Sequence, residues 1–152
     1  MTITVSSPAF EAGATIPKKH TGEGEDTSPP LHFEGVPEEA KELALICHDP
    51  DAPRESGWVH WVVYKLPANT TALAEGASGG WITGENDWGK AEYGGPMPPP
   101  GHGVHHYHFK LYALDVTLPP EPGLTMKQLL AKIEGHVIAQ GELVGTYERK
   151  KK

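Results

Sequence analysis

Three stretches of the chain carry the hydrophobic pattern of buried β-strands. Residues 43–48 form an almost wholly apolar run that Asp49-Pro50 closes, which is typical of a strand buried on both faces. Residues 58–66 and 105–115 alternate with a period of two. The later alternation predicts a core-facing set: His105, Tyr107, Phe109, Leu111 and Ala113. The earlier one predicts two faces, with Trp58, His60, Val62 and Tyr64 on one and Val59, Trp61, Val63 and Lys65 on the other.

The remaining regular structure is expected near the C-terminus. A helix should begin at Thr125, because Thr125-x-x-Gln128 offers a capping box. Its apolar residues recur at helical spacing, and Gly135 should end it: Met126, Leu129, Leu130 and Ile133. Residues 137–147 are rich in Val, Ile, Leu, Thr and Tyr and predict a late strand.

Two stretches read as loops. Residues 11–37 are interrupted by prolines and glycines and predict loop around short strands. Residues 76–103 carry Gly-Gly, Gly-Gly-Pro and Pro-Pro-Pro-Gly sequences, and loops of this length in a compact domain are often functional. We find no internal repeat or linker, so we expect one domain, residues 1–152, that is mainly β.

Composition limits the classes of function. The net charge is −7, which disfavours nucleic acid and anionic membranes as partners. No 18 apolar residues run together, so no membrane span is expected. A single cysteine, Cys47, lies in an apolar run and allows no intrachain disulfide. We therefore expect a cytoplasmic protein.

Polar residues of complementary type stand at the ends of the predicted strands. Asp49 and Asp51 follow the first strand in a segment that two prolines stiffen, and His105 and Tyr107 begin the third. His60 lies on a largely apolar strand and needs a hydrogen-bond partner if it is buried. These five side chains could converge at one end of a sheet. The alternative stays open that the aspartates only form turn hydrogen bonds and the histidines are satisfied core residues.

Other kinds of site are poorly matched. Histidines 102, 105, 106 and 108 cluster in sequence, but on a strand His105 and His106 point to opposite faces, so we expect no metal site. No nucleophile elbow or phosphate-binding glycine loop is present, so we assign no catalytic residue and no cofactor.

The ordered blocks of the sequence resemble those of a known family. Asp49-Pro50-Asp51-Ala52-Pro53, residues 57–61, the Gly-Pro and Pro-Pro-Pro-Gly of residues 95–101, and His105-His106-Tyr107 are similar to the signatures of phosphatidylethanolamine-binding proteins. Further blocks resemble the bacterial and archaeal Raf-kinase-inhibitor-like branch: residues 28–31, 86–89, 93–96 and 143–147. The resemblance runs from about Phe10 to Glu148.

The resemblance implies a sandwich of two antiparallel sheets with Greek-key connections and one or two short helices. It also implies a ligand pocket, to which the following residues would contribute: Asp49, Asp51, Pro53, His60, Pro99, Gly101, His105 and Tyr107. Family members carry a cis proline that would be Pro53 here. One departure is that His106 stands where the family usually has an arginine, which removes a permanent cation.

These expectations define a function with two alternatives. We expect a small-ligand-binding protein whose pocket takes a phosphate, sulfate, carboxylate or phosphorylated head group through His105, Tyr107 and loop N–H groups. The first alternative is an enzyme that uses Asp49 or His60 as general base. The second is an interaction module that regulates a kinase or protease through the pocket rim. The resemblance to prokaryotic members also leads us to expect a homodimer.

Overall fold

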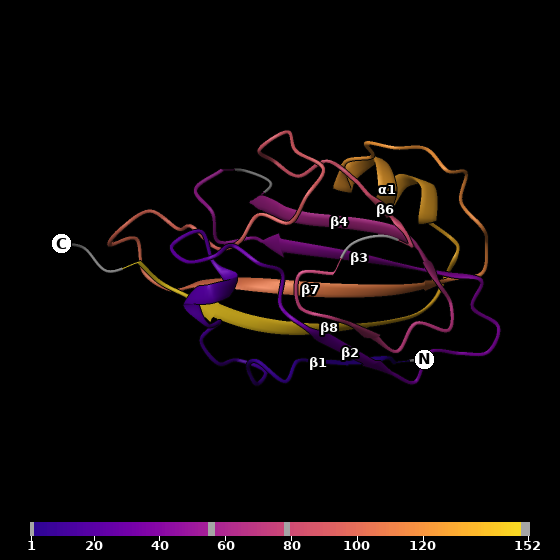
Figure 1. The fold of residues 1–152 in the computed structure, drawn as a ribbon. Helices are drawn as coiled ribbons and strands as arrows, with labels where there is room; N and C mark the ends of the chain where they lie inside the picture. The colour runs from indigo at the N-terminus through magenta and orange to yellow at the C-terminus, as the bar shows by residue number, and fades with distance from the viewer. Residues whose placement is uncertain (1, 55–56, 78–79, 150–152) are drawn as a thin grey trace.

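The computed structural model describes residues 2–54, 57–77 and 80–149, which form two antiparallel sheets with one α-helix (Figure 1). In chain order the elements are β1 (Thr4–Ser6), the 3-10 turn η1 (Lys18–His20), β2 (Leu31–Glu34), β3 (Glu42–Asp49), β4 (Trp58–Pro67), β5 (Ala72–Leu73), β6 (Ile82–Thr83), β7 (His105–Leu114), α1 (Met126–Ile133) and β8 (Val137–Tyr147).

The larger sheet has β3 at its centre and the strand order β6-β4-β3-β7-β8, and the smaller sheet has the order β1-β2-β5. β3 pairs antiparallel with β4 on one side and with β7 on the other. Between β4 and β7 the chain visits the smaller sheet at β5 and the edge strand β6, so the connection crosses β3 in Greek-key manner. The predicted fold class is therefore confirmed.

Apolar side chains fill both faces of the larger sheet. Between the two sheets lies one cluster, which takes the predicted alternating residues of β7 from Tyr107 to Ala113. The opposite face is covered by α1, whose Leu129 and Ile133 are buried against Ala44 and Ile46 of β3. Central position and two covered faces explain why β3 is apolar at nearly every residue.

The predicted helix and late strand are both found. Thr125 caps α1 by accepting from the backbone N–H of Gln128, and the Gln128 side chain accepts from the backbone N–H of Thr125. β8 occupies Val137–Tyr147. No helix in the described parts of the chain is long and apolar enough to cross a membrane.

The strict alternation predicted for β4 is wrong, because the strand is bulged twice. Cys47 pairs with Trp61 and His48 with Val59, so His60 is an extra residue in the ladder. A second shift lies at Lys65, whose φ is +60°. Each bulge reverses the sidedness of the strand. The outcome is that Val59, Val62 and Tyr64 belong to the helix-side cluster, whereas Trp61, Val63 and Leu66 lie between the sheets.

β8 lets the N-terminal segment approach closely at two glycines. The Ile3 N–H donates to the Gln140 carbonyl at 3.0 Å, and a Cβ built on Gly141 would overlap the carbonyl oxygen of Ile3. At Gly145 a Cβ would instead meet Ile16 and Phe10. The absence of side chains here is what allows the first residues to lie against the larger sheet.

Replacing Gly141 by alanine should therefore destabilise the protein. The added methyl group forces the backbone around Ile3 to move, a cost of about 1–3 kcal/mol. Urea unfolding measures the change. The control is Gln140→Ala, since that side chain is exposed and should stay within about 0.5 kcal/mol of wild type. Equal stability of both variants would contradict the close approach.

Candidate functional site

A cavity of about 280 Å³ lies where the end of β3 meets the starts of β4 and β7. Antiparallel pairing brings these three points together, because Asp49 pairs with Trp58 of β4 and His48 pairs with His108 near the start of β7. The cavity walls combine polar residues at the strand ends with apolar loop residues: Asp49, Ala52, Pro53, Trp58, His60, Trp88, Met97, Pro98, Pro99, His105 and Tyr107.

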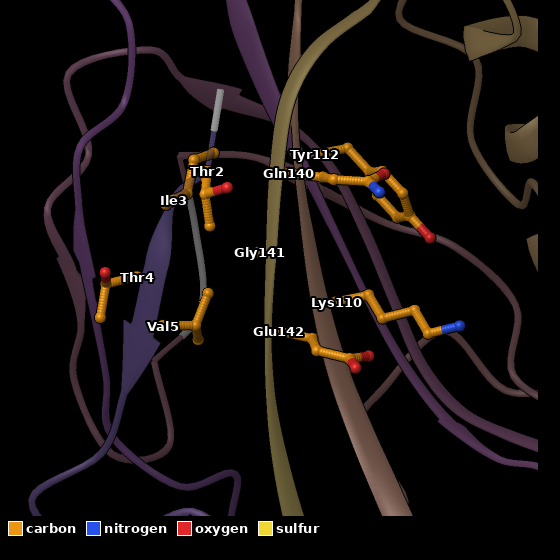
Figure 2. Close-up of a pocket in the computed structure, with 9 residues that line it drawn as sticks. All are labelled: Thr2, Ile3, Thr4, Val5, Lys110, Tyr112, Gln140, Gly141 and Glu142. Carbon is orange, nitrogen blue, oxygen red and sulfur yellow. The ribbon is translucent and has the colours of Figure 1, made fainter.

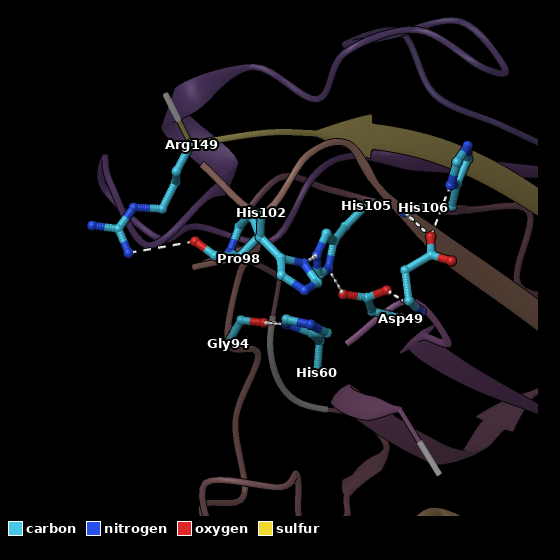
Figure 3. Close-up of polar contacts among 9 residues, drawn as sticks. Asp49, His60, Gly94, Pro98, His102, His105, His106 and Arg149 are labelled. Atoms are coloured by element: carbon cyan, nitrogen blue, oxygen red, sulfur yellow. Dashed lines mark hydrogen bonds and ion pairs between the residues drawn. The ribbon is translucent and has the colours of Figure 1, made fainter. Parts of the chain in front are cut away.

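Asp49 and His105 form a buried hydrogen-bonded pair (Figure 3). His105 Nδ1 lies 2.7 Å from Asp49 Oδ2, and the two residues are 1% and 2% exposed. Because a carboxylate oxygen can only accept, Nδ1 carries the proton. The other oxygen, Oδ1, accepts from the backbone N–H of Asp51 at 2.8 Å. Both carboxylate oxygens are thus engaged by the protein itself.

His105 has a second partner in the loop before β7. Its Nε2 lies 2.6 Å from Nδ1 of His102, and the two ring centroids are 4.8 Å apart (Figure 3). His105 is buried, whereas His102 is exposed. The result is a continuous chain of polar contacts that runs from the buried Asp49 through His105 to the surface.

His60 is held on the cavity side of β4 by its position in the bulge. Its Nδ1 lies 2.7 Å from the carbonyl oxygen of Gly94, so Nδ1 is the protonated nitrogen. The ring meets Tyr107 and Trp88 edge to face, with centroids 5.1 and 5.2 Å apart. Burial lowers the pKa of His60 below its usual value, since a buried imidazolium would lose its hydration. A neutral His60 keeps its lone pair on Nε2.

Two buried hydrogen-bond donors of the cavity walls have no partner within the described residues. They are the Tyr107 hydroxyl and the indole N–H of Trp58. Burial, followed by the nearby Asp49, raises the pKa of Tyr107 far above its usual value, so the hydroxyl remains a donor. Buried donors without partners are rare in folded proteins and each needs an explanation.

Two of the eight expected pocket residues do not line the cavity. Asp51 Oδ2 accepts from the His106 ring and backbone N–H, both at 2.8 Å, outside the cavity. Burial alone would raise the pKa of Asp51, but these hydrogen bonds outweigh it and hold the pKa below its usual value. Gly101 lies in the loop, where its N–H donates to the Arg149 carbonyl. The cavity walls contain the other six: Asp49, Pro53, His60, Pro99, His105 and Tyr107.

The cis peptide bond expected before Pro53 is absent. None of the described residues has a cis peptide bond, so the Ala52–Pro53 bond is trans. The segment is held in other ways: Arg54 N–H donates to the Ala52 carbonyl, and the Asp51 N–H bonds to Asp49. The expectation taken from the resemblance is corrected at this point.

The sequence analysis missed several residues of the wall and rim. The sequence patterns did not identify Trp58 and Trp88 as cavity residues, yet both line the cavity with ring centroids 5.3 Å apart. The guanidinium of Arg54 lies 4.9 Å from the Trp58 ring centroid and supplies a permanent cation near the mouth. Loops have no periodicity from which such placements can be read, although the run from Arg54 to Trp58 beside the signature block is a local signal.

A larger groove of about 710 Å³ runs between β1 and the outer face of β7 and β8 (Figure 2). Lys110, Tyr112 and Glu142 line it beside the N-terminal residues. No buried donor or acceptor without a partner is found among its described residues. The smaller cavity is therefore the better candidate, despite its size.

Within the described stretches, no group of three or more His, Cys, Asp or Glu residues is arranged to hold a metal ion.

The lowered pKa of His60 makes a prediction about stability. Below pH 6.5, the usual pKa of histidine, the His60 ring of the unfolded chain binds a proton, whereas the buried ring of the folded protein stays neutral. The free energy of unfolding therefore falls as the pH drops through 6.5 towards the lower pKa of His60 in the folded protein. His60→Gln removes this contribution. Urea unfolding at about pH 7.5 and about pH 5 should show a smaller loss for the variant than for wild type. The exposed His32→Gln is the control, and an undiminished loss in His60→Gln would contradict the argument.

Comparison with known proteins gives relatives across the whole chain. A UPF0098 protein from Pyrococcus horikoshii is 48% identical over 158 residues, covering 99% of this chain and 78% of that protein. A crystal structure described as a phosphatidylethanolamine-binding protein homologue from Chlamydia trachomatis superposes with a TM-score of 0.93 at 47% identity, covering 98% and 99% of the two chains. YbcL from E. coli, described as a member of the mammalian PEBP family, gives 0.90 at 36%, covering 97% and 99%.

The family model described as phosphatidylethanolamine-binding protein matches residues 6–148. The match includes every strand from β2 to β8 and the whole cavity. The family model and these relatives agree, and the chain belongs to the phosphatidylethanolamine-binding protein family.

Proposed function

We propose that the cavity binds a small anionic group, and that a phosphate monoester fits it best. The observation that carries the proposal is the pair of unpaired donors, Tyr107 O–H and Trp58 N–H, in the cavity walls. A ligand oxygen that reached either donor would satisfy it, and hydrogen bonds in which one partner is ionised are among the stronger ones in proteins. Family membership supports a ligand-binding protein in general.

The acidic residues nearby do not oppose an anion. Asp49 already accepts two hydrogen bonds, and Asp51 lies outside the cavity against His106. The Arg54 guanidinium lies over Trp58 with its Nη1 3.6 Å from Asp87 Oδ2, so it offsets that acidic charge near the cavity. Neutral His60, protonated on Nδ1, offers an acceptor at Nε2. A hydrogen phosphate monoester carries both the oxygens and the O–H group that this mixture of donors and acceptor requires.

The apolar part of the wall selects for the remainder of the ligand. Proline rings, Met97 and two tryptophans surround the polar end of the cavity. Cavities with apolar walls and a few placed polar groups favour ligands that combine a polar head with an apolar or aromatic body. Phenyl phosphate is therefore a suitable probe.

An enzyme remains the main alternative, and one observation favours it. Because Asp49 is fully engaged, the free lone pair of His60 is the stronger candidate for a general base. Following phenyl phosphate by phosphorus NMR in the presence of the protein separates the two functions. A binding protein leaves the ester intact, whereas turnover that disappears in His60→Gln would establish the enzyme.

The exposed rim of the cavity is consistent with a second function, in which this protein binds and regulates a protein partner such as a kinase or protease. Two large apolar side chains of the cavity wall are exposed there, Trp88 at 43% and Met97 at 41%. A partner that covers this rim would compete with the small ligand. The homodimer is a further proposal, which native mass spectrometry of the purified protein tests directly.

Removing the Tyr107 hydroxyl should separate binding from stability. Tyr107→Phe loses a donor to the anion, so the Kd for phenyl phosphate should rise about 10-fold or more. The same change leaves no unpaired group behind, so the melting temperature should be equal or slightly higher. Calorimetric titration and thermal unfolding measure the two effects.

Trp58→Phe should weaken binding in the same way, because the indole N–H is the other unpaired donor. The matched control is Tyr112→Phe, on the outer face of the same strand as Tyr107. That variant should bind phenyl phosphate as wild type does. The proposal fails if wild type does not bind the probe, or if Tyr107→Phe and Trp58→Phe bind it as tightly as wild type.

A further inference from the structure

Both ring nitrogens of His105 are occupied within the protein. Nδ1 donates to Asp49 at 2.7 Å, and Nε2 lies 2.6 Å from His102 Nδ1. An imidazole nitrogen makes one hydrogen bond, so no position on His105 is left for a ligand in this arrangement. Any anion that is to use His105 must first replace His102.

The loop before β7 is built to present His102 at this point. Pro99, Pro100, Gly101 and His102 form a turn in which the His102 N–H donates to the Pro99 carbonyl at 3.1 Å. Proline in the second position and glycine at φ +74° in the third suit a type II turn. Gly103, at φ +99°, follows directly.

The backbone of the turn and the residue before it are held by Arg149. The Gly101 N–H donates to the Arg149 carbonyl at 2.8 Å, and Arg149 Nη1 lies 3.5 Å from the Pro98 carbonyl (Figure 3). His102 itself is exposed, and within the described residues its ring has a hydrogen bond to His105 alone. A rotation of this one side chain therefore frees His105 Nε2 without moving the turn.

We propose that His102 is a gate, which competes with the anionic ligand for Nε2 of His105 and makes ligand binding take up a proton. The proposal rests on the proposed anion-binding function and deepens it. In the closed form the two facing nitrogens share one N–H, donated by His102 to a neutral His105. In the open form Nε2 of His105 must itself carry a proton to donate to the anion.

The proton balance follows from these hydrogen bonds. Closed, His105 holds one proton on Nδ1 for Asp49 and His102 holds one on Nδ1. Open, His105 holds protons on both nitrogens and His102 keeps the one that it had, so one proton enters from solvent for each anion bound. The imidazolium then lies between the Asp49 carboxylate and the ligand.

Charged and titratable groups approach the pair from four strands and the loop, and from β8 comes Tyr147, which is opposite His105 and donates its O–H to Glu23. Asp49 of β3 faces His105 directly, and Asp51 lies beyond it against His106. From β4 comes His60, kept neutral by burial, and from β7 comes the Tyr107 hydroxyl, which burial keeps protonated. Arg149 lies on the loop side and pairs with Glu23 at 3.5 Å. None of these supplies the proton, so it is drawn from solvent.

The test uses phenyl sulfate, an anion with no titrating group near neutrality. Titration into wild type in two buffers of different ionisation enthalpy, at about pH 8, should report uptake approaching one proton per anion bound. The Kd should rise up to about tenfold for each unit of pH increase. His102→Ala removes the competitor and should tighten binding about three- to tenfold at about pH 8. His32→Ala, an exposed histidine of the smaller sheet, should bind as wild type does.

A spectroscopic readout tests the gate without relying on a variant. Long-range proton–nitrogen NMR of histidine-labelled protein should show Nε2 of His105 unprotonated without ligand and protonated with phenyl sulfate. At the same time, the Nδ1–H signal of His102 should lose the features caused by its hydrogen bond to Nε2 of His105.

The outcomes distinguish the gate from the pocket. Binding of phenyl phosphate by wild type, together with unchanged or weaker phenyl sulfate binding in His102→Ala, overturns the gate and leaves the anion site standing. An Nε2 that stays unprotonated on binding does the same. If wild type binds neither probe, the proposed function fails and the gate fails with it.

Discussion

The buried hydrogen bond between Asp49 and His105 is the interaction on which the rest of the site depends. It joins the last residue of β3 to the first of β7, the pairing around which the larger sheet is built. Removing either partner leaves a buried polar group uncompensated, at a cost of about 3–5 kcal/mol. The same bond fixes the orientation of His105 and so decides that Nε2 faces the loop. The contact of His105 with the exposed His102 follows from that orientation.

The sequence predicted the four long strands, and it indicated that Asp49 and His105 could meet at one end of a sheet. Both are consequences of one pattern, because a strand that is apolar throughout must be central, and its antiparallel neighbours must begin where it ends. The five-residue alternation of β7 likewise predicted which face is buried. These predictions held because burial of large apolar surfaces dominates the choice of sheet register.

The parts that could not be predicted depend on local departures from periodicity. The bulge at His60 turns this side chain to the cavity through a single extra residue, which no alternation rule reveals. Asp51 follows Asp49 by two residues, and on a strand it would share its face. The strand ends at Asp49, however, and the turn carries Asp51 outwards to His106. Trp88 and His102 lie in loops, where hydrogen bonds and turn geometry decide direction.

The polar groups of the site fall into two classes, and the contrast explains what each is for. Asp49 and the Nδ1 atoms of His60 and His105 are fully paired by the protein, as buried groups must be if the fold is to be stable. The donors of Tyr107 and Trp58 are not, and each costs about 1–3 kcal/mol while it remains unpaired. Phenylalanine would fill the position of Tyr107 without that cost. A chain selected for stability alone would carry phenylalanine at that position. The unpaired polar atoms that weaken the folded state are therefore the ones that a ligand would satisfy.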